Sequence, residues 1–491
     1  MRRWVLAATI LGSTMAFIDS TVVNVALPVL QRELHAGVDD AQWIVDSYLL
    51  VLSALILAGG SLGDHFGRVR VFGIGVAFFA AASLWCGLAP SAAQLIAARA
   101  LQGLAAAMLV PGSLSIITSA FPPAERGKAI GTWSALTALA MIGGPLLGGL
   151  LVQTASWRAV FLINLPIAAA VLWILPKIRL ERDTRDRASI DWLGTFLITL
   201  ALGGITFGLI EQMTAPAIGG VLALIAFIAV ERRSRNPIVP LTLFRSRTFT
   251  GANILTLLLY AALSGSMFLL PFNLIQVQGY TPLGAGAAFL PFVVTMSLLS
   301  RWTGSIADRI GPRIPLIIGP LLAAAGFALL ALPGVGGSYW TTFFPAVLVL
   351  GTGMAVTVAP LTTTVMTSID DERHAGAASG INNAVSRAAG LLAIAIFGAL
   401  AVSVFARDLD ARLGRLGVPP DVRQAMQRDS RRLAESEPPP HLGPAIRSRV
   451  QTEVRHAFVA AFRVDMLLAA ALAGLSAGGA LVIAKRDEHK A

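Results

Sequence analysis

Charged residues are scarce in this chain. They make up 13% of its 491 residues, whereas hydrophobic residues make up 55% and the mean hydropathy is +0.73. A soluble globular protein carries about 25% charged residues, so the composition favours a membrane protein. Apolar runs of about 18 to 25 residues recur, each long enough to cross a hydrocarbon core roughly 30 Å thick as a helix. Because barrel strands would show ~10-residue alternating segments instead, we predict an all-α integral membrane protein.

Cysteine pairs, histidine clusters and catalytic motifs are also missing. The single cysteine, Cys86, lies in an apolar run, so no disulfide framework exists and we expect a packing role for it. The six histidines are scattered without metal-ligand spacing, and no phosphate-binding loop or nucleophile motif stands out. We therefore expect no enzyme activity, no metal and no cofactor.

The charge that is present is mostly basic, with a net value of +11. The Arg and Lys residues lie in loops between apolar runs and not on one soluble face, which argues against a nucleic-acid partner. Alternate short loops hold most of them, so the positive-inside rule predicts a multi-pass protein of the cell membrane with both termini in the cytoplasm. Fourteen spans are expected, at about residues 4–28, 42–62, 71–89, 92–120, 128–153, 157–176, 190–211, 216–231, 248–275, 281–302, 313–332, 340–367, 375–405 and 457–484.

The segment at residues 406–456 departs from this charge rule. It carries ten Arg and seven acidic residues, yet the count of spans places it outside the cell. Longer loops cross the membrane with less regard to charge. We therefore expect a long, solvated and partly helical extracytoplasmic loop, and a dedicated partner-binding element is the alternative.

An internal duplication organises the chain. GSLGDHFGRVR at residue 60 returns as GSIADRIGPRI at residue 304, which sets Asp64 and Asp308 244 positions apart. AERGKAIG at residue 124 and DERHAGAASG at residue 371 repeat at nearly the same offset. Two matches at almost one offset predict two parallel repeats. The expected parts are an N-terminal six-helix half at 1–176, two extra helices at 177–247 and a C-terminal six-helix half at 248–491.

Several motifs carry a family resemblance over essentially the whole chain. Besides the 60–70 stretch, they are FIDSTVVNVALP, LIAARALQGLAAA, GGPLLGGLL, WRAVFLINLP and NPIVPLTLFRSRTF. In this order they resemble the fourteen-helix drug:proton antiporter branch of the major facilitator superfamily. The resemblance implies two parallel six-helix halves plus two extra linker helices. It also implies a proton-coupled antiporter that exports amphipathic, often cationic drugs or toxic compounds from the cytoplasm.

Two rival functions stay open. A dedicated proton-driven exporter of one natural product or lipid would share this pattern and differ in the breadth of its substrates. A channel would need a continuous polar lining, whereas the spans hold only a handful of charges. In every case the bilayer and small molecules are the expected partners, and an accessory envelope protein leaves no signal in the sequence.

Three charged residues lie within the first four spans. Asp19 lies in the outer half of the first span, Asp46 near the outer end of the second, and Arg99 deep in the fourth. Such residues are costly in hydrocarbon and usually mark ion or substrate pathways. Since a carboxylate can avoid that cost by taking up a proton, we expect Asp19 and Asp46 to couple protons to transport. The resemblance implies that Arg99 tunes a nearby carboxylate.

Each of these residues has a structural alternative. Asp19 could hydrogen-bond locally to Thr21 or Asn24. Asp46 could be solvated at the interface, and Arg99 could pair with backbone carbonyls.

A substrate pocket is expected to combine these acids with an apolar wall. Its candidate residues are Asp19, Asp46, Asn24, Phe268, Phe272, Asn273 and Gln276. An apolar wall with a few polar groups suits lipophilic substrates and polyspecific binding.

Two glycine-rich stretches are expected to govern the conformational change. Glycine in the 60–70 stretch permits a tight turn with φ above zero. The resemblance implies a cytoplasmic latch there, made by Gly60, Asp64, Gly67, Arg68 and the repeat's Asp308. Small residues four apart let helices approach closely, and proline removes a backbone donor. The resemblance implies an antiporter seam at Gly144, Pro145, Gly148 and Gly149. A topology-setting turn and ordinary close packing are the respective alternatives.

Other charged residues in or near the spans receive structural interpretations. Glu211 is expected at an interface, with substrate contact as the alternative. Arg387 is expected to extend its charge toward the cytoplasmic surface. Asp465 lies two positions after Arg463, so a local charge pair is expected there, and a functional site is the alternative.

Overall fold

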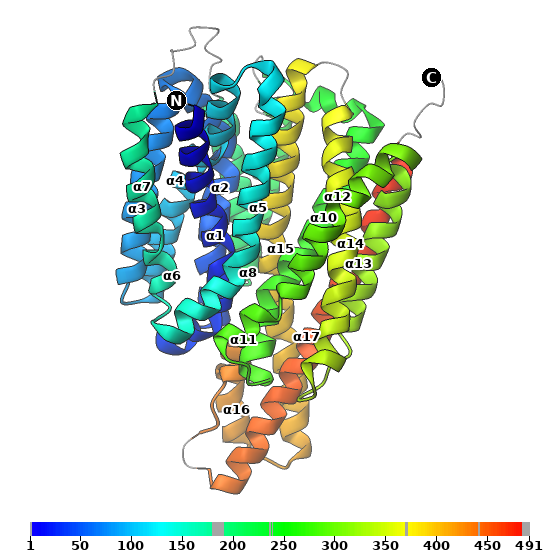
Figure 1. Cartoon of the computed structure of the whole chain (residues 1–491). Helices are drawn as coiled ribbons and strands as arrows, with labels where there is room; N and C mark the ends of the chain where they lie inside the picture. The colour runs from blue at the N-terminus through cyan, green and yellow to red at the C-terminus, as the bar shows by residue number, and fades with distance from the viewer. Residues whose placement is uncertain are drawn as a thin grey trace. The chain divides into compact units, whose positions relative to one another are not determined.

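The computed structural model describes residues 2–178, 191–234, 237, 239–368, 372–439 and 442–483. All regular elements in these ranges are helices (Figure 1). The α-helices are α1 Arg2–Glu33, α2 Val38–Phe66, α3 Arg68–Leu88, α4 Ala92–Ala120, α5 Pro123–Thr154, α6 Ala159–Leu162, α7 Asn164–Ile174, α8 Trp192–Ile210, α9 Thr214–Glu231, α10 Arg247–Phe272, α11 Pro282–Ala287, α12 Leu290–Ile310, α13 Arg313–Leu330, α14 Tyr339–Thr367, α15 Glu372–Arg415, α16 Pro420–Arg428 and α17 Pro444–Val482. Short helices are η1 Leu175–Lys177, η2 Leu241–Arg245, η3 Asn273–Val277 and η4 Ser430–Glu435.

Within the described ranges, twelve helical stretches are long and apolar enough to cross a membrane. They overlap twelve of the fourteen spans expected from the sequence. The other two expected spans, 42–62 and 128–153, fall on α2 and α5, which are 29 and 32 residues long. Both helices include side chains outside the described set, so the structure supports an all-helical membrane protein with twelve candidate spans and leaves the count of fourteen unconfirmed.

Contacts between Cα atoms divide the chain into two compact units. The first comprises Met1–Ala36, Asp40–Ile238 and Thr281–Ala287, and the second comprises Gly37–Asp39, Val239–Tyr280 and Ala288–Ala491. The two helices expected as linkers, α8 and α9, pack against each other and belong to the first unit.

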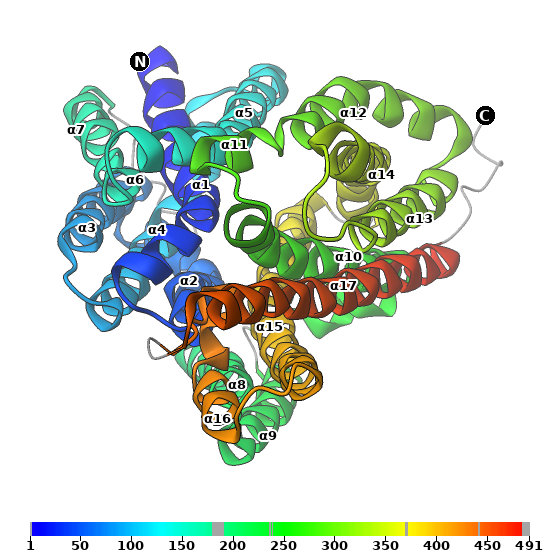
Figure 2. The ribbon, with the colours of Figure 1, turned by 90° about the horizontal axis from the view of Figure 1, so that it is seen from below.

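In the first unit, α1 lies among α4, α5 and α7 (Figure 2). Close approach of the helices depends on small residues, as is usual where lipid supplies no hydrophobic driving force. A Cβ atom at Gly103 of α4 would lie 3.2 Å from the Tyr48 Cα of α2. This contact brings α2 and α4 together at the level of the buried polar residues described below.

The expected turn in the 60–70 stretch is a one-residue break between two helices. Gly67 separates α2 from α3 with a φ of 100°, which confirms the prediction of a glycine with positive φ. The repeat uses the same device, because Gly311 has a φ of 83° between α12 and α13. These two glycines occupy corresponding positions in the duplicated motif.

The 406–456 segment contains helices, as expected, and it also buries an apolar stripe that was not expected of a solvated loop. In Figure 1, α15 and α17 run on beyond their neighbours, with α16 beside them. The buried residues of this segment include Leu409, Leu413, Val422, Met426 and Leu433. Their spacing of four residues within a helix places them on one face, so the segment folds by burying an apolar stripe.

Charges in the same segment pair with one another. Arg423 Nη2 lies 2.7 Å from Asp410, and Arg412 Nη1 lies 3.2 Å from Glu453. The ion pairs join α15 to α16 and to α17. The segment thereby accommodates part of its high arginine content without a partner molecule.

Candidate functional site

A fully buried carboxylate, Asp19, lies in the middle of α1. Arg99 of α4, 1% exposed, forms an ion pair with its Oδ2 atom. A charge of either sign buried alone would be expensive, and each of these two compensates the other. The sequence had singled out both residues, and the structure brings them together.

The second oxygen of Asp19 is also satisfied. Oδ1 accepts hydrogen bonds from Gln102 Nε2 at 2.9 Å and from Asn164 Nδ2 at 3.2 Å. The same two amides donate to Ser83 Oγ, at 2.7 and 3.0 Å. Because these residues lie on α3, α4 and α7, the carboxylate of α1 is tied to three further helices.

Arg99 contacts several groups besides Asp19. Its Nη1 donates to Gln102 Oε1 at 2.8 Å, and its Nε donates to the Ile44 carbonyl of α2 at 3.0 Å. The guanidinium carbon lies 4.3 Å from the centre of the Tyr48 ring, a cation–π distance. Arg99 therefore makes both contacts considered from the sequence, a carboxylate pair and a backbone carbonyl.

Asp46 is a second buried acid on α2, two residues after Ile44. It is 0% exposed, and neither carboxylate oxygen has a hydrogen-bond partner among the described residues. Solvation at an interface, the structural alternative, is therefore excluded. A buried polar group without partners costs free energy, and a charged one costs far more.

The local alternative for Asp19 fails as well. Thr21 donates its hydroxyl to the Phe17 and Ile18 carbonyls, at 3.2 and 3.1 Å. Asn24 is partly buried on α1, and no hydrogen bond joins it to Asp19 in the described part of the chain. The carboxylate is bound by other helices instead of by its own.

The residues expected to form an apolar wall lie in the second unit. Phe268 and Phe272 of α10 are buried, with ring centres 5.5 Å apart, and Asn273 begins η3. Three of the four candidate residues here are thus buried neighbours. The fourth, Gln276, has a different environment.

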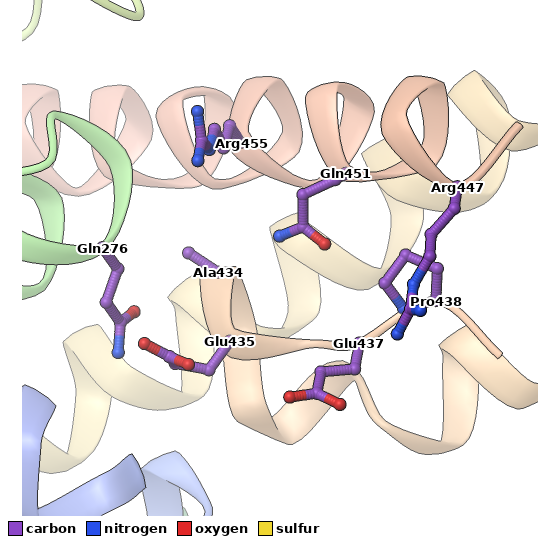
Figure 3. Close-up of a pocket in the computed structure, with 8 residues that line it drawn as sticks. All are labelled: Gln276, Ala434, Glu435, Glu437, Pro438, Arg447, Gln451 and Arg455. Atoms are coloured by element: carbon purple, nitrogen blue, oxygen red, sulfur yellow. The ribbon is translucent and has the colours of Figure 1, made fainter. Parts of the chain in front are cut away.

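Gln276 borders a polar cavity of about 340 Å³. Figure 3 shows Arg447, Gln451 and Arg455 along α17 and two glutamates of the 406–456 segment across from them. The cavity is lined by Gln276, Ala434, Glu435, Glu437, Pro438, Arg447, Gln451 and Arg455. Its lining of charged side chains differs from an apolar wall for lipophilic compounds.

Three of the four glycines in the 143–151 stretch, Gly144, Gly148 and Gly149, make close helix contacts. A Cβ atom at Gly144 would overlap the Thr21 side chain, and one at Gly148 would lie 2.8 Å from the Val22 carbonyl oxygen. At Gly149 it would lie 2.8 Å from Leu283 Cα of α11. The stretch, which includes Pro145 inside α5, thus packs α5 against α1 and against α11.

Only part of the expected latch is described. Arg68 Nη1 donates to the Ser115 carbonyl at 3.3 Å and also contacts Ser119. A Cβ atom at Gly60 would make an ordinary contact with Pro111, 3.7 Å away. The side chains of Asp64 and Asp308 lie outside the described residues.

Two interpretations of isolated charges have different outcomes. Glu211 Oε1 accepts from Trp43 Nε1 at 3.0 Å at the end of α8, which suits a polar helix end. The expected pair of Asp465 with Arg463 is wrong, because Arg463 Nε donates to the Ala331 carbonyl at 3.0 Å. Residues two apart on a helix do not face each other, which explains the failure.

The comparisons with known proteins agree on the family. The family model for the Major Facilitator Superfamily matches residues 9–394 of this chain. The Multidrug resistance protein Stp of Mycobacterium tuberculosis is 36% identical over 424 residues, covering 84% of this chain and 78% of that protein. The Tetracenomycin C resistance and export protein of Streptomyces glaucescens is 33% identical over 510 residues, covering 99% and 92%.

Solved structures support the fold. A bacterial homolog to the human lysosomal transporter Spinster, in an inward-facing and unoccupied conformation, is similar with a TM-score of 0.67 and 19% identity, covering 99% of both chains. An autoinhibited peptide transporter of the POT family gives a TM-score of 0.68 at 13% identity, covering 99% of this chain and 98% of the other. This multi-pass membrane protein is a transporter and not an enzyme, and it belongs to the Major Facilitator Superfamily.

Proposed function

We propose that the chain is a proton-coupled antiporter that exports amphipathic, often cationic drugs or toxic compounds from the cytoplasm. The observation that carries this proposal is the buried pair of Asp19 and Arg99, with the unpaired acid Asp46 on the adjacent helix. Relatives named for multidrug resistance and for tetracenomycin C resistance and export support the export of drugs or toxic compounds.

Asp19 offers a simple switch between two protonation states. When ionised, its Oδ2 atom holds Arg99, while the two amides donate to Oδ1. A proton that binds at Oδ2 replaces the guanidinium there and leaves the bonds at Oδ1 in place. Arg99 keeps its own charge, since guanidinium is not deprotonated in proteins, and the Ile44 carbonyl remains its acceptor. Proton binding thus changes one contact and removes one negative charge.

Asp46 adds a second exchangeable proton. A carboxyl group buried without donors costs less in its neutral form than as an anion. A cationic substrate that approaches the site favours the charged form and expels the proton. Two acids in different surroundings, one paired with Arg99 and one unpaired, let the transporter vary how many protons it exchanges.

The number of protons decides which gradient drives export. One proton exchanged for a monovalent cation moves no net charge and uses only the pH gradient. Two protons also draw on the membrane potential, which supplies about 2.3 kcal/mol per elementary charge per 100 mV. We propose that Asp46 supplies the second proton for dicationic cargo.

We also propose a topology for this activity in the cell membrane. Fourteen spans, with α2 and α5 added to the twelve candidates, place both termini in the cytoplasm and form two parallel six-helix halves with α8 and α9 as extra helices. The 60–70 stretch would act as the latch, the 143–151 stretch as the seam, and Phe268, Phe272 and Asn273 would contribute to the substrate wall.

A dedicated exporter of one natural product is the second candidate function. It is favoured by the relative named for a single compound, tetracenomycin C. Resistance of one expressing strain to several unrelated compounds would separate the two functions in favour of multidrug export.

Proton release from purified protein tests the proposal. Addition of a monocationic or dicationic compound to wild-type protein in weakly buffered solution is expected to acidify the medium. Asp46→Asn is expected to retain exchange of monocations and to lower transport of dications by about tenfold or more, equivalent to about 1.4 kcal/mol. The matched control is Asp40→Asn, since Asp40 is a partly exposed acid on the same helix. Unchanged dication transport by Asp46→Asn would reject the second-proton role, and no proton release by wild type would reject antiport itself.

A further inference from the structure

A third buried acid, Asp465, lies in the second unit on α17. It is 0% exposed, and neither of its carboxylate oxygens has a hydrogen-bond partner among the described residues. The helix packs against α10, α13 and α15 (Figure 2). An ionisable residue buried within a membrane helix is costly, so Asp465 is a candidate functional site.

The register of the helices shows what surrounds Asp465. On α10, Gly251 lies against Gly479 near one end of α17, and Gln276 shares a cavity with Arg455 toward the other end. Asp465 therefore lies level with residues 265–269, where Phe268 and Leu269 are buried. The hydroxyl of the intervening Ser266 donates to the Leu263 carbonyl at 2.9 Å.

The α13 side is apolar as well. The hydrogen bond from Arg463 to the Ala331 carbonyl fixes the register of α13 against α17. Phe327 and Leu330, both fully buried, lie close to this level. Among the described residues, neither α10 nor α13 places a charged side chain at the level of Asp465.

The charged and titratable side chains on the surrounding helices either bind other groups or lie at other positions along the helix axes. Arg463 points away from Asp465, and Arg407 of α15 donates to the Ser403 carbonyl at 3.1 Å. Arg313 of α13 donates to the Leu481 carbonyl, near the far end of α17. Tyr260 of α10 lies five or more residues before this level. Gly390 of α15 lies against Ser264, so Arg387 lies about one to two helical turns before the level of Asp465. None of these groups forms an ion pair with Asp465 in the described part of the chain.

We propose that Asp465 is a proton-binding site in the second unit, neutral in this conformation, which releases its proton when the packing around α17 changes during transport. The inference rests on the proposed antiport. A proton is the one cation that a single carboxyl group binds without further ligands, whereas a metal ion requires several. No group of three or more His, Cys, Asp or Glu side chains that could hold a metal occurs among the described residues.

The release step has a simple balance. The O–H bond of the Asp465 carboxyl group breaks, the proton passes to water, and the carboxylate remains until it takes up another proton. A carboxylate is stable only where water or a cation reaches it, so release requires an opening between α17 and its neighbours. The site would thus couple the charge of one residue to the conformation of the second unit.

Infrared spectroscopy of the purified full-length protein tests the protonation state directly. The C=O stretch of a neutral carboxyl group is expected in the wild type, and its Asp465 component is lost in Asp465→Asn. The control Asp429→Asn replaces a partly exposed acid of the same unit and leaves that component unchanged. Asp465→Glu serves as a second variant for the case that Asp465→Asn disturbs the fold. It keeps a carboxyl group and is expected to show a shifted C=O band. A spectrum that is the same in wild type and both Asp465 variants would overturn the proposal.

Proton counting tests the release. Asp465→Asn is expected to release fewer protons per bound substrate than wild type. Asp465→Glu is expected to restore the wild-type number. An unchanged count in Asp465→Asn, with the infrared band lost, would mean a permanently neutral structural acid and would also overturn the proposal. If wild type releases no protons with any compound, antiport fails, while the infrared result still decides whether Asp465 is neutral.

Discussion

Replacing Arg99 by methionine is expected to abolish transport and to destabilise the first unit by about 3 to 5 kcal/mol, because the substitution leaves Asp19 buried without its counter-charge. For a unit of this size the loss corresponds to a fall of roughly 6 to 20 °C in the thermal unfolding temperature. Unfolding of the detergent-purified protein, followed by intrinsic fluorescence, measures the change.

The double variant Asp19→Leu with Arg99→Met separates structure from function. Replacing both members of a buried ion pair by apolar residues is often neutral or stabilising, so we expect the unfolding temperature to recover. Transport is expected to stay absent, because the buried acid of α1 is gone. Recovery of both properties would show that the pair serves stability alone.

An exposed pair in the same unit provides the control. Arg2 and Glu125 lie 2.9 Å apart, and both side chains are 51% exposed. Arg2→Met is expected to change stability by less than about 1 kcal/mol, as is usual for solvent-exposed ion pairs. An equal loss in Arg2→Met and Arg99→Met would contradict the special cost of the buried site.

Replacing Gly148 by alanine is expected to impair folding and transport together. The added Cβ would lie 2.8 Å from the Val22 carbonyl oxygen and 3.2 Å from Val22 Cα, so backbone atoms of α1 must move. Overpacking of this kind costs about 1 to 3 kcal/mol. Since α1 carries Asp19 three residues before Val22, the displacement also disturbs the carboxylate.

Gly143→Ala on the same helix is the matched control for this substitution. A Cβ atom at Gly143 would have no neighbour within 4 Å. There alanine is expected to be neutral or to stabilise α5 by up to about 1 kcal/mol through its higher helix propensity. Similar unfolding temperatures and transport rates for the two variants would contradict a tight α1–α5 contact.

The sequence located the charges of the site but not its hydrogen-bonding network. Asp19 and Arg99 stand out because charged residues are costly in a membrane span. Gln102, Ser83 and Asn164 are uncharged, and residues of these types are common in membrane helices. Gln102 carried one usable signal, since it lies three residues after Arg99 and therefore on the same helix face.

Burial of Asp46 and Asp465 depends on tertiary packing, which no local pattern reports. Both lie near predicted span ends, where interfacial solvation is the alternative to proton coupling for Asp46 and a local pair with Arg463 is the expectation for Asp465. In the structure both side chains are fully buried. A helical projection would have shown that Arg463 and Asp465 point to different sides.

The fold was predictable where hydropathy sets it and less so where helices extend beyond the membrane. Apolar runs located the twelve candidate spans, and the duplicated motif located both positive-φ glycines. Hydropathy ended the spans near residues 405 and 457, whereas α15 continues to Arg415 and α17 begins at Pro444. Leu409 and Leu413, four residues apart, carried a helical signal that the high local charge obscured.

Uphill transport by reconstituted protein tests the central claim most directly. Vesicles with an acidic lumen and wild-type protein are expected to accumulate a cationic substrate against its gradient. Asp19→Asn replaces the acid by an amide that cannot exchange a proton, so we expect accumulation to fall to the level of protein-free vesicles while downhill substrate exchange persists. Accumulation by Asp19→Asn at the wild-type rate would contradict the account.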